Sequence, residues 1–273
     1  MPAGTAASVD PATLPDPLDE ALRLIALADG RGLVVRLMGG LAFRAQAPAW
    51  IAGQRRVDCD IDFAIRGRDR KALTELLTSS GYAADKQYNA LFGQKQMYFV
   101  DLARKRPMDV LVDQFEMCHR FEFGDRLGLT KPTLPLAELL LSKLQVVKIN
   151  RKDVLDALAL LAEHPLAGDD GSGDPSAATA AINTTRILGL TSNDWGWWRT
   201  ITLNLDKLAA FLESDGKAGE LEAERPLRFD PAAQVAALQA TIEAAPKSTR
   251  WKLRARLGER AAWYAEPEEV GHG

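Results

Sequence analysis

Two short apolar segments that carry aspartates constrain this chain more than any other feature. Residues 58–65 and 107–115 have apolar side chains at alternate positions, which is typical of strands. Side chains alternate between the two faces of a strand, so Asp60 and Asp62 are expected on one face, about 7 Å apart. Asp109 occupies an equivalent position in the second segment. If the two strands pair, three carboxylates meet on one patch of a sheet.

Three neighbouring carboxylates repel one another unless cations neutralise them. Hard divalent ions with oxygen ligands, above all Mg²⁺, suit such a group. Asp113 is in phase with Asp109 and is the main alternative for the third carboxylate. Asp109 is preferred because it lies between apolar residues, whereas Asp113 approaches the end of the strand.

Composition sets broad limits. With 273 residues, 47% of them hydrophobic and 26% charged, the chain resembles a globular protein with a large core. The net charge of −3 gives no general attraction to nucleic acid or anionic membrane, so any such binding depends on local basic clusters. Cys59 and Cys118 lack metal-binding spacing and predict reduced core thiols in a cytoplasmic protein. We expect no membrane association, because no apolar run is long enough to span a bilayer.

The patterns predict an α/β (α+β) protein whose mixed sheet is flanked by helices and followed by a mostly helical region. The expected parts are a flexible N-terminus over residues 1–17, a sheet domain with trailing helices over 18–164, a linker over 165–180 and a helical C-terminal region over 181–273. The expected helices lie near residues 18–28, 68–80, 134–147, 152–163, 177–188, 195–214 and 231–265, and the strands near 34–38, 58–65, 95–103 and 107–115.

Gly39-Gly40 lies between an expected strand and an expected helix. Glycines there let a phosphate approach the backbone, and the free amides at a helix start favour anions. A Gly-Gly pair alone more often marks a tight turn. Its order before the strand with Asp60 and Asp62 and the strand with Asp109 makes phosphate binding the favoured interpretation.

Taken together, these motifs resemble the polymerase-β-like nucleotidyltransferase superfamily, and most of all its AbiEii-type branch of minimal and toxin-type members. The resemblance covers residues 33–162 and is carried by the segments Gly39-Gly40-Leu41-Ala42, Arg56 with 58–63, 109–112, 139–145 and 151–156. The chain departs from the family in two ways. Many members have Gly-Ser in place of Gly39-Gly40, and the gap between Gly40 and Asp60 is long.

The resemblance implies a Mg²⁺-dependent transfer of a nucleoside monophosphate from an NTP to an acceptor hydroxyl on tRNA, on a protein or on a small molecule. A toxin-type member would also have an antitoxin partner. Asp60 and Asp62 would hold Mg²⁺ on the NTP, and a second ion would bridge them to Asp109, which is also the candidate general base.

The phosphates would lie against the Gly39 and Gly40 amides. Because no serine hydroxyl is present, Arg44 or Arg56 would assist in binding the phosphates.

Lys143 interrupts an apolar helical stripe and has two interpretations. Its stem may snorkel at the edge of the stripe, or its ammonium reaches the nucleotide phosphates or the carboxylates. Asp153 and Asp156 share a face of the next helix. We expect them to cap that helix and pair with Lys152 or Arg151, with a direct role at the nucleotide as the alternative.

Other features favour structural roles. His119 lacks ligand spacing, and Trp195, Trp197 and Trp198 are expected to pack between parts of the chain rather than stack on bases. The basic stretch 247–260 is expected to be a solvated face, with RNA contact as the alternative.

Two other functions remain open. The chain could be a catalytically inactive nucleotide-sensing or partner-binding protein of the same fold. A metal-dependent phosphohydrolase has less support, because no histidine accompanies the carboxylates.

Overall fold

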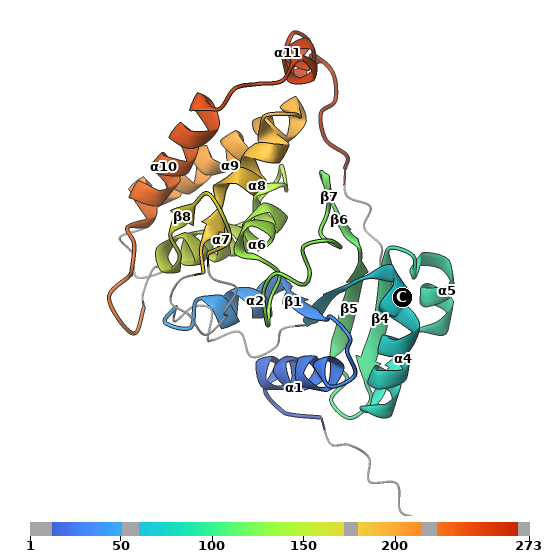
Figure 1. Cartoon of the computed structure of the whole chain (residues 1–273). Coiled ribbons are helices and arrows are strands. Elements are labelled where there is room, and N and C mark those ends of the chain that lie inside the picture. The colour runs from blue at the N-terminus through green and yellow to red at the C-terminus, as the bar shows by residue number, and fades with distance from the viewer. Residues whose placement is uncertain (1–12, 51–59, 172–179, 215–222, 267–273) are drawn as a thin grey trace, which may run out of the picture.

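The computed structural model describes residues 13–50, 60–171, 180–214 and 223–266 and shows a mixed α/β fold (Figure 1). The main sheet consists of β1 (Arg36–Met38), β2 (Ile61–Ile65), β3 (Tyr82–Ala84), β4 (Gln96–Asp101) and β5 (Pro107–Val112). Two small strand pairs are β6 (Gln114–Glu116) with β7 (Arg120–Glu122), and β8 (Leu166–Ala167) with β9 (Ile182–Asn183). The α-helices are α1 (Pro17–Asp29), α2 (Gly39–Gln46), α4 (Arg70–Ser79), α5 (Lys86–Phe92), α6 (Leu136–Leu144), α7 (Arg151–Glu163), α8 (Thr184–Thr191), α9 (Trp195–Ser214), α10 (Pro231–Ala244) and α11 (Thr249–Ala255). The predicted fold class is confirmed.

The five-stranded sheet has the order β1-β2-β5-β4-β3. β2 and β5 run parallel, whereas the other neighbouring strands are antiparallel. On one face, Phe63 of β2 and its register partner Val110 of β5 are fully buried. Because side chains alternate along a strand, the opposite face carries the intervening residues, Asp62 and Asp109.

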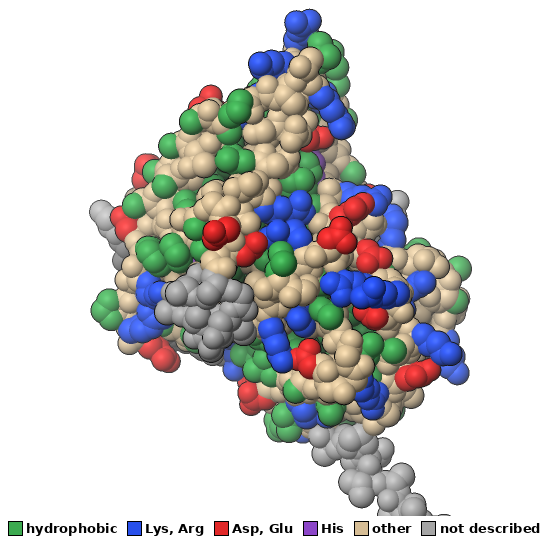
Figure 2. Space-filling view, in the orientation of Figure 1, with side chains coloured by type: hydrophobic (Ala, Val, Ile, Leu, Met, Phe, Trp, Pro, Cys, Tyr) green, Lys and Arg blue, Asp and Glu red, His purple; other side chains and the backbone are tan. Residues whose placement is uncertain are grey.

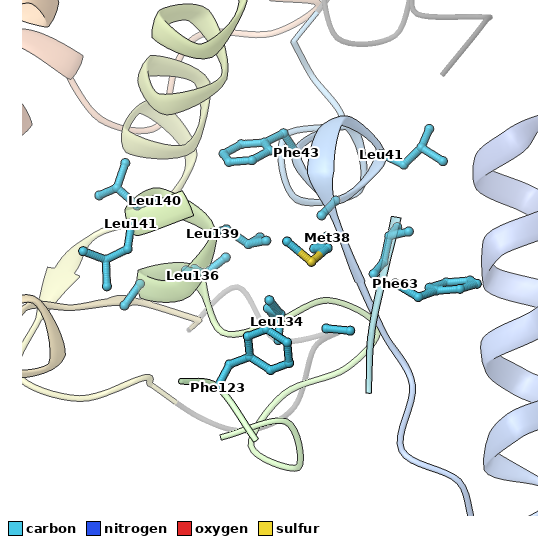
Figure 3. Close-up of a cluster of buried hydrophobic side chains, with 14 of the residues drawn as sticks. Met38, Leu41, Phe43, Phe63, Phe123, Leu134, Leu136, Leu139, Leu140 and Leu141 are labelled. Atoms are coloured by element: carbon cyan, nitrogen blue, oxygen red, sulfur yellow. The ribbon is translucent and has the colours of Figure 1, made fainter. Parts of the chain in front are cut away.

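Helices α6 to α10 lie beside the sheet, on the side of β1 and α2 (Figure 1). Leu139 of α6 lies beside Met38, close to Phe43 of α2 (Figure 3). One continuous cluster of buried apolar side chains runs from Leu24 in α1 to Ile242 in α10. The predicted helical region is therefore joined to the sheet by a shared core.

The predicted linker over residues 165–180 is folded where the structure describes it. β8 pairs with β9, and the carboxylate of Asp170 accepts hydrogen bonds from Arg126 at 2.7 Å and Asn183 at 3.0 Å. Arg126 also pairs with the fully buried Glu138 at 2.5 Å. The described part of this segment is therefore a folded connection, and residues 172–179 lie outside the described part.

The predicted flexible N-terminus is likewise anchored in its described part. Thr13 is buried, and its carbonyl accepts hydrogen bonds from Arg104. Asp16 caps α1 by accepting from the amide of Leu18 at 2.8 Å. Residues 1–12 lie outside the described residues.

Two predicted helices have different limits in the structure. The helix expected over 231–265 divides into α10 and α11, because Pro246 lacks an N–H and Ser248 starts a new helix as its N-cap. The helix expected over 177–188 begins only at Thr184, after β9. In the described residues, no helix is both long and apolar enough to cross a membrane.

Candidate functional site

The candidate site is built where the parallel strands β2 and β5 place two aspartates side by side. In their register Asp62 lies opposite Asp109, and neighbouring register partners point to the same face of the sheet. The sequence analysis predicted that the two aspartate-bearing strands pair, and they do. Both carboxylates are half-buried.

Asp60 lies just outside β2 and is exposed, so its predicted place within the strand is wrong. Two neighbours explain the late start of β2. β1 reaches only as far as Met38, which pairs with Asp62, before Gly39 begins α2. In the parallel register Asp60 would face Pro107, which has no N–H to donate. Asp60 still acts on Asp62 through its charge.

The electrostatics of Asp62 show how crowded with negative charge this patch is. Burial raises the pKa of the Asp62 carboxyl to about 7, and the charges of Asp109 and Asp60 add to the rise. Lys143 and Lys152 oppose it. Near neutral pH the site therefore gains stability from an added positive charge, whether a proton or a cation.

Gly39 brings the start of α2 against the Asp62 carboxylate. Its φ is 62°, and a Cβ at this position would lie 1.8 Å from Asp62 Oδ2. Only glycine allows this approach of backbone to carboxylate. No side chain caps α2, so the amides of its first turn, including Gly40, are available for an anionic group.

Lys143 does not snorkel into solvent, so the first of its two interpretations is wrong. Its side chain is 14% exposed, and its ammonium pairs with Asp153 at 2.6 Å and with Asp156 at 3.2 Å. Burial alone would lower the pKa of Lys143, but the attraction of Asp156 and Asp153 outweighs it and raises that pKa. The ammonium also lies 5.3 Å from the centre of the Phe43 ring.

Asp153 and Asp156 therefore act differently from expectation. The predicted cap of α7 is wrong, because Asn150 caps the helix by accepting from the Asp153 amide at 2.9 Å. The carboxylates of both aspartates instead hold Lys143. Lys143 in turn lowers the pKa of Asp62, so the charges of α6 and α7 reach the sheet site.

Replacing Lys143 by Met is expected to destabilise the protein by about 3 kcal/mol, because removing one partner of a buried ion pair leaves charge without compensation. Asp156, which is 2% exposed, bears most of this cost. Urea denaturation measures the change. Lys148→Met, at an exposed lysine just after α6, is the control and is expected to have little effect. Equal stability of the two variants would contradict the structural role of Lys143.

The two arginines predicted to bind phosphate differ in what is known of them. Arg56 lies outside the described residues. Arg44 donates to Asp16 Oδ2 at 2.8 Å and so joins α2 to the start of α1. Its guanidinium is engaged in the fold, and a contact with nucleotide stays a prediction.

Sequence reasoning missed four residues around the aspartate pair. Gln96 of β4 donates to Asp109 Oδ1 at 2.6 Å, and Tyr98 lies opposite Asp109 in the register. Burial followed by the charge of Asp109 raises the pKa of both Tyr98 and Tyr88. Lys152 acts on Asp62 through its charge. The alternation of β4 placed Gln96 and Tyr98 on one face, but only the register joined them to Asp109.

The rival carboxylate Asp113 serves a turn at the far end of β5. It has a φ of 61°, and its side chain accepts from the Gly67 amide at 3.1 Å. It lies one residue beyond Val112, which pairs with the last residue of β2. Asp109 is therefore the residue that meets Asp62.

His119 and the tryptophans pack together, as the structural interpretation predicts. The His119 ring lies 4.9 Å from that of Trp197, and its Nε2 is 2.8 Å from Thr200 Oγ1. Burial lowers the pKa of His119 to about 4, so its ring is neutral at neutral pH. Trp198 packs edge-on against Trp251 of α11 at 5.2 Å.

The donors fit a hard cation by their chemistry, and the backbone at Gly39 leaves the space that a side chain would fill. Among the described residues, no group of three or more His, Cys, Asp or Glu side chains is already arranged to hold a metal ion. Asp62 and Asp109 are thus the pair that would hold one, with Asp60 beside them.

No family model matches this chain, and no curated protein matches it significantly.

Proposed function

We propose that the protein is a Mg²⁺-dependent nucleotidyltransferase that moves a nucleoside monophosphate from an NTP to an acceptor hydroxyl. One observation carries the proposal: the register that sets Asp62 opposite Asp109, directly against the backbone of Gly39. Paired carboxylates next to an uncapped helix start suit a polyphosphate and its metal ion.

Asp62 and Asp109 would hold the metal ion, with Asp60 as the third carboxylate. When bound, Mg²⁺ neutralises these carboxylates and the triphosphate and polarises the α-phosphate. The amides of Gly39 and Gly40 bind phosphate oxygens, and Gln96 fixes the orientation of Asp109.

In the transfer the acceptor oxygen bonds to the α-phosphorus as the bond to pyrophosphate breaks. The hydroxyl proton passes to Asp109. The acceptor itself, on tRNA, on a protein or on a small molecule, is part of the proposal only as a class.

The test is to incubate the protein with each α-³²P-labelled NTP, Mg²⁺ and a cell lysate or total RNA. We expect release of pyrophosphate and a labelled product that resists removal of free nucleotide. Binding of NTP without pyrophosphate release would instead indicate the nucleotide-sensing alternative. Release of inorganic phosphate alone would indicate a phosphohydrolase and overturn the proposal.

A further inference from the structure

A second cavity, of about 490 Å³, shares no residue with the aspartate site. Four separate segments form it: the turn between β6 and β7, the start of α9, one side of α11, and residues 262–265. The amide of Ala265 donates to the carbonyl of Cys118 at 3.0 Å, which ties the last of these segments to the first. The cavity is therefore a product of the tertiary fold rather than of one loop.

Aromatic and cationic side chains line this cavity together. They include Trp195, Trp263, Tyr264, Arg250 and Arg254. The volume lies within the range of about 300–1,000 Å³ that is typical of ligand sites. A planar ring that carries negative charge matches such walls, because rings stack on aromatic side chains and arginines attract the charge.

The walls are held in place by contacts of their own. Arg254 lies 4.8 Å from the centre of the Trp195 ring and donates to the carbonyls of Gly258 and Ala261. The indole N–H of Trp263 donates to Thr200 Oγ1 at 3.2 Å. A Cβ at Gly196 would lie 2.5 Å from the Trp263 carbonyl oxygen, so the wall fits closely against α9. A ligand would meet a site that is already formed.

The surface next to the cavity is strongly basic. The stretch 247–260 holds six cations and one carboxylate in a chain of net charge −3. That carboxylate, Glu259, pairs with Arg199 at 2.5 Å. Arg250, Lys252 and Arg256 are exposed, and Figure 2 shows Lys and Arg side chains gathered at the tip of the molecule where Figure 1 places α11.

We propose that this cavity binds one nucleotide of a single-stranded nucleic acid, with the neighbouring phosphates on the exposed cations of α11. Aromatic walls accept any base by its flat face, and a charged track beside them accepts the backbone. A free mononucleotide would use the cavity but not the cations of α11 that lie outside it. The inference does not depend on the proposed nucleotidyltransferase activity.

The test is fluorescence anisotropy with labelled 12-nucleotide single-stranded RNA and DNA across a salt series. We expect both strands to bind and affinity to fall as salt rises. AMP is expected to compete only weakly, since it lacks the neighbouring phosphates. Competition by AMP at the affinity of the strand would overturn the assignment to a strand, and absence of binding at low salt would overturn the proposal.

Charge variants test the surface. Arg250→Glu with Lys252→Glu is expected to weaken strand binding at least tenfold and to reduce the salt slope by about two, one for each lost phosphate contact. Arg31→Glu with Lys71→Glu is the matched control, because it changes the net charge equally at exposed sites on other elements. Equal weakening in both double variants would mean that only overall charge matters, which would overturn the site.

Tyr264→Ala tests the cavity wall. It is expected to weaken strand binding several-fold while leaving the salt slope unchanged, since no phosphate contact is lost. Thermal melting of each variant checks that the fold survives. Asp62→Asn is expected to bind strands like the wild type, so failure of transfer and failure of strand binding can be told apart. Unchanged affinity of Tyr264→Ala would contradict base stacking in the cavity.

Discussion

Asp62→Asn is expected to abolish pyrophosphate release from NTP while leaving the protein folded and at least as stable as the wild type. The amide keeps the shape of the carboxyl but cannot supply the charge that a metal ion and a triphosphate require. We expect a loss of at least about 1,000-fold, because phosphoryl transfer depends on positioning and charge neutralisation. The measurement is a pyrophosphate-release assay with saturating NTP and Mg²⁺.

The effect of the same substitution on stability has a defined sign. The folded state raises the pKa of Asp62 to about 7, so it holds the proton more tightly than the unfolded chain does. Stability is therefore lost as the pH rises from about 4 to 7, when the folded carboxyl is forced to ionise. Asp62→Asn removes this loss, and its melting temperature should exceed that of the wild type more at pH 8 than at pH 5.

Asp113→Asn is the matched control for Asp62→Asn. It makes the same chemical change in an aspartate at the far end of β5, where the side chain serves a turn. Asparagine also tolerates the positive φ of this position. We expect full activity from this variant. A variant at Asp62 that keeps its activity, or one that unfolds, would contradict the assignment of Asp62 to the site.

The sequence predicted the pairing of the site because alternation alone determines which face a strand residue occupies. Asp62 and Asp109 fall at alternate positions to buried residues, so any pairing of their strands brings them together. Alternation could not predict where β2 begins, because that depends on Pro107 and on the end of β1. Asp60 was therefore placed in the strand by mistake.

Partners that come from elsewhere in the chain were out of reach of sequence patterns. The ion pairs of Lys143 join α6 to α7, and the contact of Gln96 with Asp109 depends on the antiparallel register of β4 and β5. Neither follows from spacing within one element. The positive φ of Gly39 is similar: a glycine before a helix suggested close approach, but only the fold shows that the approaching group is Asp62.

Gly39→Ala is expected to be among the most damaging single substitutions in the sheet domain. Its Cβ would lie 1.8 Å from Asp62 Oδ2 and 2.6 Å from Asp62 Cγ, so the carboxylate or the start of α2 must move. The left-handed φ adds a further cost of about 1 kcal/mol for any residue with a Cβ. We expect a total loss on the order of 3 kcal/mol in urea denaturation. Displacement of Asp62 should also lower the transfer rate about 100-fold.

Gly32→Ala separates the two costs. Gly32 has a φ of 71°, yet nothing lies within 4 Å of the Cβ that alanine would add. This variant bears the backbone strain without the clash, and we expect a loss of only about 1 kcal/mol. The difference between the two glycine variants then measures the contact between Gly39 and Asp62.

A double variant completes the comparison. Asp62→Ala removes the oxygen and Cγ that clash with the new methyl group and leaves only the Cβ of residue 62, 3.0 Å away. In this background Gly39→Ala should cost little more than Gly32→Ala, because most of the clash is gone. The coupling energy between positions 39 and 62 is obtained from the four unfolding free energies. A coupling near zero would mean that the backbone at Gly39 does not lie against the Asp62 carboxylate, and the proposed phosphate and metal site would then lack its geometry.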